Sequence, residues 1–262
     1  PIYPHMQIQF IGCGNMGEII LQSIISSGYN IKNIFIKTKT EEKEIELKKL
    51  YNINTGLNSE SDIIILAIKP KQFHELDLSI FKKDILVISI MAGISIDKIK
   101  SKINCAKIIR TMPNTPMSVG KGVIGYIETS SVTNKEKDFF IQTFLKNGKL
   151  IECKNEDEIN KITALSGSGP AYFYYFTEII KQKAMEMGFN EEQATIISNN
   201  TFIGASNLLE KSNLEVERLR QNITSPGGTT EKAIETFKRN GFKKCITDAI
   251  DNAYNKAKDL NN

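Results

Sequence analysis

A short loop near the far end of the chain carries residues that suit an anionic ligand. It reads Ser225-Pro226-Gly227-Gly228-Thr229-Thr230 and lies between two helix-like stretches. Proline and paired glycines end any helix there, and the two threonines supply hydroxyls where a new helix must begin. The first turn of a helix leaves backbone N–H groups unpaired and pointing the same way, as a small carboxylate requires. We therefore expect the N–H groups of Gly227, Gly228 and Thr229 to hold a carboxylate.

A glycine pattern near the start of the chain predicts a dinucleotide site. Gly12, Gly14 and Gly17 form G-x-G-x-x-G directly after the apolar run Ile8–Ile11 and at the start of a helix-like stretch. Gly12 permits the tight turn, Gly14 lets a pyrophosphate approach the backbone, and Gly17 allows close helix–strand packing. The N-terminus of the helix then faces the phosphates. The less favoured alternative is a tight turn with only a structural role.

The segment after the second predicted strand indicates which nicotinamide cofactor is used. An NAD enzyme usually carries Asp or Glu there to hold the ribose hydroxyls, whereas this chain has Lys37-Thr38-Lys39-Thr40. Ammonium and hydroxyl groups suit a 2′-phosphate, so NADPH is the expected cofactor, with NADH possible. In the alternative, these lysines are ordinary surface residues and Glu41 or Glu42 takes the place of the acid.

Three further loops are expected to reach the same ligands. Ala67-Ile68-Lys69-Pro70 and Met91-Ala92-Gly93 follow buried strands, and open α/β sheets bind ligands at the carboxyl ends of their strands. The third loop, Met112-Pro113-Asn114-Thr115-Pro116, has two prolines that fix its path. The amide of Asn114 suits a nicotinamide or substrate edge because it can both donate and accept. Its alternative role is a rigid connection between domains.

The elements that position these loops alternate in type along the first half of the chain. Short apolar runs separated by helical patterns predict a parallel sheet with helices on both faces. The predicted strands are Ile8–Ile11, Ile34–Ile36, Ile63–Ile68, Ile85–Ile90, Lys107–Arg110, Val123–Ile127 and Leu150–Glu152, and the predicted helices are Met16–Ser27, Glu41–Leu50 and Lys135–Leu145.

After Lys154 no strand pattern recurs, and the sequence predicts an all-helical domain. Helices are expected over Asp157–Leu165, Ala171–Met187 and Phe242–Leu260, with Asn190 capping another. Ser166–Pro170 is interpreted as a break between helices that shapes the substrate pocket. We expect an α/β architecture: a Rossmann-type doubly wound domain at 6–154, then a helical domain at 155–262. The aromatic run Tyr172–Phe176 is expected to form core and subunit contacts.

Composition and charge exclude several functional classes. The 262 residues are 40% hydrophobic and 24% charged, an ordinary globular balance, and the net charge of +4 is too small and too evenly spread for nucleic acid. No apolar run is long enough to cross a membrane. The start resembles an extension before a native Met6 rather than a signal peptide. With four cysteines and no C-x-x-C pair, we expect buried thiols, no metal and a cytoplasmic location.

Five motifs then occur in a characteristic order and spacing: Gly12–Gly17, Ala67–Pro70, Met112–Pro116, Ser166–Tyr172 and Ser225–Thr230. Together they resemble the pyrroline-5-carboxylate reductase family over nearly everything after Met6. The S-P-G-G-T-T loop combined with S-G-S-G-P-A-Y distinguishes this family, whereas many dehydrogenases share the glycine fingerprint. The resemblance implies a Rossmann domain and a helical dimerisation domain. It also implies reduction of the cyclic imine 1-pyrroline-5-carboxylate to L-proline with NAD(P)H, the last step of proline synthesis, by dimers that often form rings of five.

The motifs and the resemblance together give a set of expected site residues. The expected cofactor contacts are Ile11, Gly12, Cys13, Gly14, Asn15, Met16, Gly17, Lys37, Thr38, Asn58, Ala67, Ile68, Lys69, Pro70, Met91, Ala92, Gly93 and Asn114. The expected substrate contacts are Ser168, Asn222, Gly227, Gly228, Thr229 and Thr230. A further substrate-loop position, often a glutamate in the family, is Asn213 here, so the resemblance does not carry over at that residue.

Thr230 is the expected catalytic residue. Hydride transfer to the imine carbon is easier when the ring nitrogen is protonated or hydrogen-bonded. The hydroxyl of Thr230 would orient the ring and relay a proton from water, while holding the reactants in line supplies most of the rate. The alternative role of Thr230 is a simple N-cap.

Two other functions are compatible with the fingerprint. A β-hydroxyacid dehydrogenase would use a helical lysine, and Lys161 lies on a suitable helix but lacks a Gly-Gly-x-x-x-Lys context. A non-catalytic NADPH-binding regulator would keep Gly12–Gly17 but would not need Ser225–Thr230. Whether this loop meets the nicotinamide of its own chain or of a partner stays open.

Overall fold

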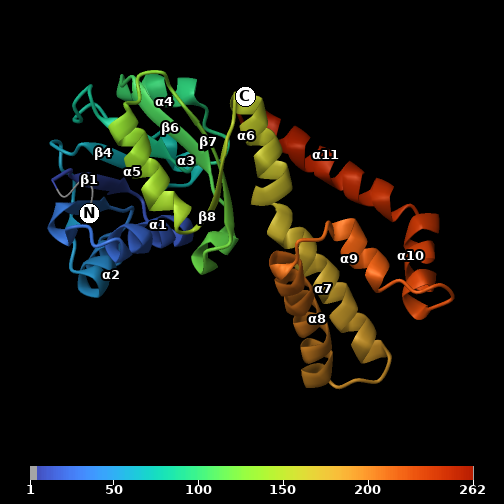
Figure 1. Cartoon of the computed structure of the whole chain (residues 1–262). Helices are drawn as coiled ribbons and strands as arrows, with labels where there is room; N and C mark the ends of the chain where they lie inside the picture. Colours follow the sequence, from blue (N-terminus) through green and yellow to red (C-terminus); the bar gives the residue numbers. More distant parts are fainter. Residues whose placement is uncertain (1–4, 262) are drawn as a thin grey trace. The chain divides into compact units, whose positions relative to one another are not determined.

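The computed structural model describes residues 5–261, so residues 1–4 of the extension expected before Met6, and residue 262, lie outside the described range. The chain forms two compact units (Figure 1). The first comprises Pro1–Ser168 and Ala253–Asn262, and the second comprises Gly169–Asn252. The expected boundary at 154 therefore differs from the division between these units, because the next helix packs with the first unit.

An eight-stranded sheet forms the frame of the first unit (Figure 1), in the order β3-β2-β1-β4-β5-β6-β7-β8. All neighbouring strands are parallel except β6 and β7. The order from β3 to β6 is that of a dinucleotide-binding sheet, with its switch point between β1 and β4. The strands are β1 Ile8–Ile11, β2 Ile34–Lys37, β3 Asn54–Thr55, β4 Ile63–Leu66, β5 Leu86–Ser89, β6 Lys107–Met112, β7 Gly122–Glu128 and β8 Gly148–Glu152.

Helices cover both faces of this sheet (Figure 1). Ile63 and Ile65 of β4 belong to the core under α1, α2 and α5, whereas Ile64 and Leu66 belong to the core under α3 and α4. All four side chains are completely buried, as expected for a parallel strand covered twice. The helices are α1 Asn15–Ser26, α2 Glu41–Tyr51, α3 Pro70–Phe73, α4 Ile96–Ile103 and α5 Asn134–Leu145.

The first unit departs from the sequence prediction in four ways, the first being that the short strand β3 was not predicted. The strand expected over Ile63–Ile68 ends at Leu66, so Ala67 and Ile68 already belong to the loop above it. Helix α4 was not predicted, whereas α3 lies where a helix-like stretch was expected around Phe73 and begins at Pro70, a favoured first helical position. Strand β7 runs antiparallel to β6, because an apolar run specifies burial but not strand direction.

Helix α6 (Glu156–Ile162) continues into a π-helical turn at Thr163–Gly167 instead of the uniform helix and break expected. The N–H of Ser168 donates to the carbonyl of Thr163, five residues earlier, at 2.9 Å. Glu156 fixes the start of α6 by pairing with Arg110 of β6 and by accepting the N–H of Ile96 at 2.8 Å. Burial lowers the pKa of Arg110 to about 10, so its guanidinium remains charged at neutral pH.

The second unit contains helices joined by loops and no strand among its described residues. Asn190 begins α8 with the expected capping box, accepting the N–H of Gln193 at 2.9 Å. Phe173 stacks on Phe202 with ring centroids 5.7 Å apart, which joins α7 to α8. The helices are α7 Gly169–Glu186, α8 Glu191–Lys211, α9 Val216–Asn222, α10 Thr229–Arg239 and α11 Phe242–Asn261, of which the last part belongs to the first unit.

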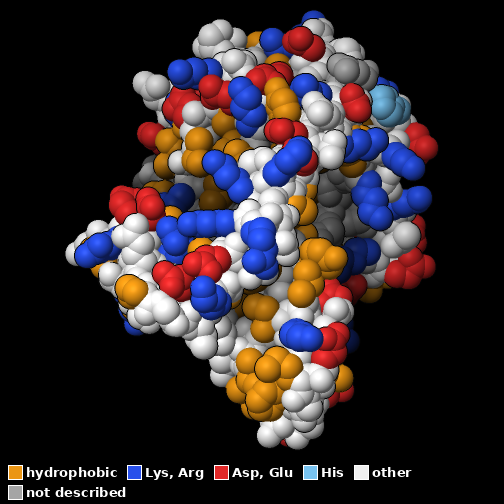
Figure 2. Space-filling view, turned by 90° about the vertical axis from the view of Figure 1, so that its right-hand side faces the viewer, with side chains coloured by type: hydrophobic (Ala, Val, Ile, Leu, Met, Phe, Trp, Pro, Cys, Tyr) orange, Lys and Arg blue, Asp and Glu red, His pale blue; other side chains and the backbone are white. Residues whose placement is uncertain are grey.

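Helices α7 and α8 expose much of their apolar surface. Among their described residues only Gly169, Ala184, Ala194 and Ser198 are buried, while Tyr175 is 66% exposed. Figure 2 shows apolar side chains gathered toward the lower end of its view. Large apolar side chains exposed on two neighbouring helices are typical of an interface.

Over residues 5–261 no helix combines the length and apolarity needed to span a bilayer. The same residues contain no cluster of three or more His, Cys, Asp or Glu side chains that could hold a metal ion. Cys13, Cys105 and Cys153 are buried as expected, whereas Cys245 is exposed, which corrects the expectation for that thiol.

Candidate active site

The turn between β1 and α1 has the geometry that a phosphate-binding loop requires. Gly12 has a φ of +80°, and its N–H donates to the carbonyl of Lys37 at 2.7 Å. A Cβ on Gly12 would lie 2.4 Å from Ile68 Cγ2 and 2.6 Å from the carbonyl oxygen of Ala67. A Cβ on Gly14, the N-cap of α1, would have no neighbour within 4 Å among the described residues. The turn is therefore packed at Gly12 and open at Gly14, where a phosphate can approach the helix N-terminus.

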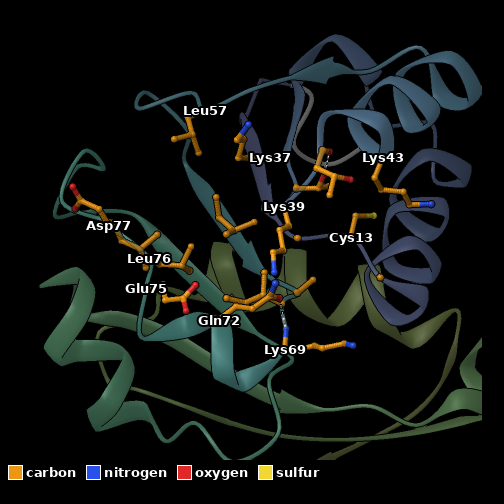
Figure 3. A pocket seen from close by; sticks show the side chains of 18 residues that line it. Cys13, Lys37, Lys39, Lys43, Leu57, Lys69, Gln72, Glu75, Leu76 and Asp77 are labelled. Atoms are coloured by element: carbon orange, nitrogen blue, oxygen red, sulfur yellow. Dashed lines mark hydrogen bonds between the residues drawn. The ribbon is translucent and has the colours of Figure 1, made fainter.

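A cavity of about 550 Å³ opens beside this turn (Figure 3). Three of the expected cofactor segments line it together: Ile11–Gly14, Lys37–Thr40 and Ala67–Lys69. They come from the carboxyl ends of β1, β2 and β4, which the sheet order makes neighbours. The structure therefore brings the main parts of the predicted dinucleotide site to one edge of the sheet.

Lys37 is neutralised within the chain. Its Nζ lies 2.9 Å from Oε1 of Glu44, and the N–H of Thr38 donates to the same oxygen at 3.0 Å. Glu44 is only 8% exposed, and a buried carboxylate needs such partners. Lys37 lines the cavity as expected, but its charge is paired with that of Glu44 on α2.

Lys39 and Lys43 are two further cations of the cavity lining. In Figure 3 Lys39 reaches into the middle of the cavity, and it forms no ion pair with any described residue. Lys43 lies 3.0 Å from Glu46 and 3.6 Å from Glu18, and these carboxylates raise its pKa. Glu41 and Glu42, the acids of the alternative interpretation, are exposed and do not line the cavity.

Cys13 lies inside the glycine turn as an inert thiol. It is 5% exposed, and burial together with the nearby charge of Glu18 raises its pKa to about 12. A thiol with such a pKa stays neutral at physiological pH, so it is neither a reactive nucleophile nor a negative charge facing the phosphates. Its role at this position is therefore that of a small apolar side chain.

Several expected cofactor residues lie away from the cavity lining. The side chain of Asn58 donates to Oε1 of Gln7 at 2.6 Å and anchors the loop beside β4. Gly93 has a φ of +72°, and a Cβ there would lie 2.8 Å from the Cβ of Leu260 in the last turn of α11. The remaining expected contacts outside the lining are Asn15, Met16, Gly17, Pro70, Met91, Ala92 and Asn114. Direct cofactor contact by these residues stays a prediction.

Asn114 is engaged at both ends of its amide by the chain itself. Its Oδ1 accepts the N–H of Val123 at 2.8 Å, and its Nδ2 donates to the carbonyl of Ser166 at 3.0 Å. The side chain is 7% exposed. This geometry favours the rigid connection considered above over a contact with nicotinamide.

The loop at 225–230 forms a tight turn before α10, with Gly227 at a φ of +73° and Gly228 as the N-cap. The N–H of Gly227 donates to Oε2 of Glu231 at 2.7 Å, and the N–H of Gly228 donates to the carbonyl of Ser225 at 3.0 Å. The chain itself therefore occupies two of the three N–H groups expected to hold a carboxylate, and substrate contact by Gly227 and Gly228 stays a prediction.

Thr229 and Thr230 are the first two residues of α10 and do not cap it. The N-cap role considered for Thr230 is therefore wrong. Neither their backbone N–H groups nor their hydroxyls have a partner among residues 5–261. By contrast, the hydroxyl of Thr236 in the same helix donates to the carbonyl of Lys232 at 2.9 Å. The helix start thus keeps both threonine hydroxyls and the first N–H groups available for a ligand.

Comparison with known proteins identifies the family. Residues 7–93 match the family model for NADP oxidoreductase coenzyme F420-dependent, and residues 156–260 match that for pyrroline-5-carboxylate reductase dimerisation. A pyrroline-5-carboxylate reductase from Vibrio alginolyticus is 31% identical, over 98% of this chain and 98% of the relative. This chain belongs to the pyrroline-5-carboxylate reductase family.

Solved structures of the pyrroline-5-carboxylate reductase family share the fold. The enzyme from Coxiella burnetii is 33% identical, with 98% of this chain and 99% of that chain covered and a TM-score of 0.87. The Plasmodium falciparum enzyme, solved with NADP bound, is 27% identical, with 99% of each chain covered and a TM-score of 0.80. The predicted fold class, a Rossmann-type sheet followed by a helical dimerisation domain, is confirmed.

The cavity of this pyrroline-5-carboxylate reductase family member also has lining residues that the sequence did not indicate. They are Lys43, Leu57, Gln72, Glu75, Leu76, Asp77 and Leu78. Pro70 at the first position of α3 is the signal that would have found Gln72, because it starts a helical turn that brings that side chain back over the loop. Lys43 lies on α2, in the helix predicted at Glu41–Leu50, whereas the others lie in irregular chain, for which apolar spacing gives no position.

Proposed function

We propose that this chain reduces 1-pyrroline-5-carboxylate to L-proline with NADPH as the hydride donor. The observation that carries the proposal is the start of α10, where Thr229 and Thr230 keep their N–H groups and hydroxyls unpaired. Membership in the pyrroline-5-carboxylate reductase family over 98% of the chain supports it. Neither the β-hydroxyacid dehydrogenase nor the non-catalytic regulator has comparable support.

The residues at the β1–α1 turn fit a dinucleotide. The open space above Gly14 admits a pyrophosphate, and the cavity lined by Lys39 and Ala67–Lys69 extends from the turn. When bound, the reduced nicotinamide supplies a hydride, which with one proton converts the C=N bond to CH–NH. The chain itself holds the phosphates at the N-terminus of α1 and keeps the neutral thiol of Cys13 beside them.

The start of α10 would hold the imine. Its carboxylate would accept hydrogen bonds from the N–H groups of Thr229 and Thr230, in place of those of Gly227 and Gly228. Asn222, exposed at the end of α9, offers a further amide. The hydroxyl of Thr230 would donate to the ring nitrogen and relay a proton from water, so that negative charge does not develop there.

Preference for NADPH would depend mainly on Lys39. Lys37 and Lys43 already face carboxylates, whereas Lys39 carries an uncompensated charge in the cavity. We expect Lys39→Ala to raise the KM for NADPH about tenfold while the KM for NADH changes little, since the lost attraction acts only on the 2′-phosphate. Lys71→Ala is the matched control, because Lys71 is exposed and lies outside the cavity lining. An equal rise with both cofactors would remove Lys39 from 2′-phosphate recognition.

The working form would be a homodimer formed through α7 and α8, with rings of five dimers as a further possibility. The match to a dimerisation model at residues 156–260 and the exposed apolar faces of both helices support the dimer. Light scattering of the purified protein would distinguish one chain, two chains and ten.

One assay tests the proposed reaction. Oxidation of NADPH should begin on addition of pyrroline-5-carboxylate, proline should accumulate in equal amount, and NADH should support a slower rate. Hydroxy- and keto-acids serve as the comparison substrates. Turnover of those acids alone would favour the dehydrogenase, and NADPH binding without turnover of any cyclic imine would favour the regulator.

A further inference from the structure

The end of β6 and the loop after it contact the π-helical turn at Thr163–Gly167. Asn114 Nδ2 donates to the carbonyl of Ser166 at 3.0 Å. Beside it, a Cβ on Gly167 would lie 2.9 Å from Cε of Met112, so the Met112 side chain packs directly against the glycine. Both contacts lie inside the first unit, and both come from the segment whose path the two prolines fix.

The carbonyl of Ser166 needs such a donor. In a regular α-helix it would accept the N–H of the residue four positions later, which here is Pro170 and has no N–H. Ser166 is half-buried, and a carbonyl shielded from water is destabilising when it has no donor. The amide of Asn114 supplies the missing donor, and its own Oδ1 is held by the N–H of Val123 at 2.8 Å, which fixes the direction of the amide.

Ser168 directly follows this turn, which fixes its position. Its N–H donates back to the carbonyl of Thr163 at 2.9 Å, the wide spacing of a π turn, and its side chain is partly exposed. Single π turns are uncommon and occur often at functional sites, because they turn one side chain out of the regular helical direction. Here the turn persists because a loop outside the helix satisfies its carbonyl.

We propose that Asn114 is a positioning residue that holds the π turn and thereby sets the direction in which Ser168 meets the substrate. The inference rests on the proposed function, since Ser168 is the substrate contact in question. In this role Asn114 acts through Ser166, because both ends of its amide are hydrogen-bonded within the chain.

Asn114→Asp tests this role. The variant keeps the acceptor for the Val123 N–H but replaces the donor by an oxygen that repels the Ser166 carbonyl. We expect kcat/KM for pyrroline-5-carboxylate to fall at least tenfold with the KM for NADPH within twofold of wild type. Amide hydrogen exchange over residues 163–170 should become faster. Asn147→Asp is the matched control, because Asn147 likewise donates one amide hydrogen to a carbonyl, that of Met117 at 3.3 Å, away from the turn.

The outcomes separate the possible roles. A tenfold rise in the KM for NADPH would overturn the proposal in favour of a direct cofactor contact. Unchanged kcat/KM with unchanged exchange would also overturn it. If the wild type does not reduce the imine at all, the proposed function fails, and the exchange measurement still decides whether Asn114 holds the turn. If Asn114→Asp does not fold, Asn114→Ala takes its place with the same two measurements, because it removes the donor to Ser166 without adding a repelling oxygen.

Discussion

The two glycine turns of this chain both precede a helix, but they are constrained by different things. At the β1–α1 turn the chain itself fills the space, since a Cβ on Gly12 would lie 2.4 Å from Ile68. At the turn before α10, a Cβ on Gly227 would have no neighbour within 4 Å in the described residues, and the positive φ of +73° is the main demand for glycine. The first turn is held by packing and the second by its own backbone conformation and the hydrogen bond to Glu231.

This difference shows where function and stability are separated in the molecule. Residues at the first turn serve the fold and the cofactor together, so most substitutions there should affect both. Residues at the second turn are exposed or half-buried, so their chemistry can change with little effect on folding. Substitutions at the first turn should therefore change both stability and cofactor binding, whereas those at the second turn should change activity with little change in stability.

The largest effect is expected at Gly12, with Gly14 as its partner in the same turn. Gly12→Ala would place a side chain at a φ of +80° against Ile68 and Ala67. Left-handed strain and overpacking should together lower the free energy of unfolding by about 3 kcal/mol. Gly14→Ala should change it by less than about 0.5 kcal/mol, because its φ is −79° and the site is open.

The same pair separates packing from binding. Gly14→Ala should still weaken NADPH at least tenfold, because the methyl group occupies the approach of the pyrophosphate. Denaturant unfolding and fluorescence titration with NADPH measure the two effects. A Gly14→Ala variant that binds NADPH as tightly as wild type would mean that the phosphates do not approach this turn.

The next largest effect is expected at Thr230, where activity should change without stability. Thr230→Ala should lower kcat for the imine about 100-fold, the size of effect expected when a proton-transfer group is lost. The free energy of unfolding should stay within about 0.5 kcal/mol of wild type, since the hydroxyl makes no internal hydrogen bond among the described residues.

Thr236→Ala supplies the control in the same helix. Its hydroxyl bonds to the carbonyl of Lys232, so kcat should be unchanged. Thr230→Ser should recover most of the lost rate because it restores the hydroxyl. Wild-type turnover in Thr230→Ala would remove the catalytic role.

Much of the first turn could be predicted from the sequence, because close packing restricts which residue types fit at each position. Gly12 and the strand Ile8–Ile11 are constrained by neighbours that every compact arrangement of this sheet requires, and the alternation of Ile63, Ile64 and Ile65 between two cores follows from burial on both faces. Apolar spacing and glycine position are therefore sufficient to find the sheet and the dinucleotide turn.

The polar partners could not be predicted, for a physical reason. Lys37 and Glu44 lie in different elements, and their spacing does not reveal that the carboxylate turns inward to bind both the lysine and the N–H of Thr38. Asn114 and Ser166 are still farther apart in the chain. A hydrogen bond between distant residues depends on side-chain directions that only the packed structure determines, so the partners of Lys37 and Asn114 could not be read from their positions in the sequence.

The smallest effect is expected for substitution of Glu231, which tests whether the substrate carboxylate binds at the turn before α10. Its carboxylate holds the N–H of Gly227 at 2.7 Å, close to the N–H groups of Thr229 and Thr230 that would bind the carboxylate of the substrate. Glu231→Gln keeps an acceptor for Gly227 but removes the negative charge. If the substrate carboxylate binds there, repulsion falls, and the KM for pyrroline-5-carboxylate should drop about threefold, or about 0.7 kcal/mol, with kcat unchanged.

Salt provides the control for Glu231, because screening weakens an interaction between charges near the surface. The difference in KM between wild type and Glu231→Gln should shrink as the ionic strength rises. A KM that rises in Glu231→Gln would contradict the expected direction. It would mean that this carboxylate attracts the protonated ring nitrogen, and Glu231, rather than Thr230, would then be the residue that faces the imine.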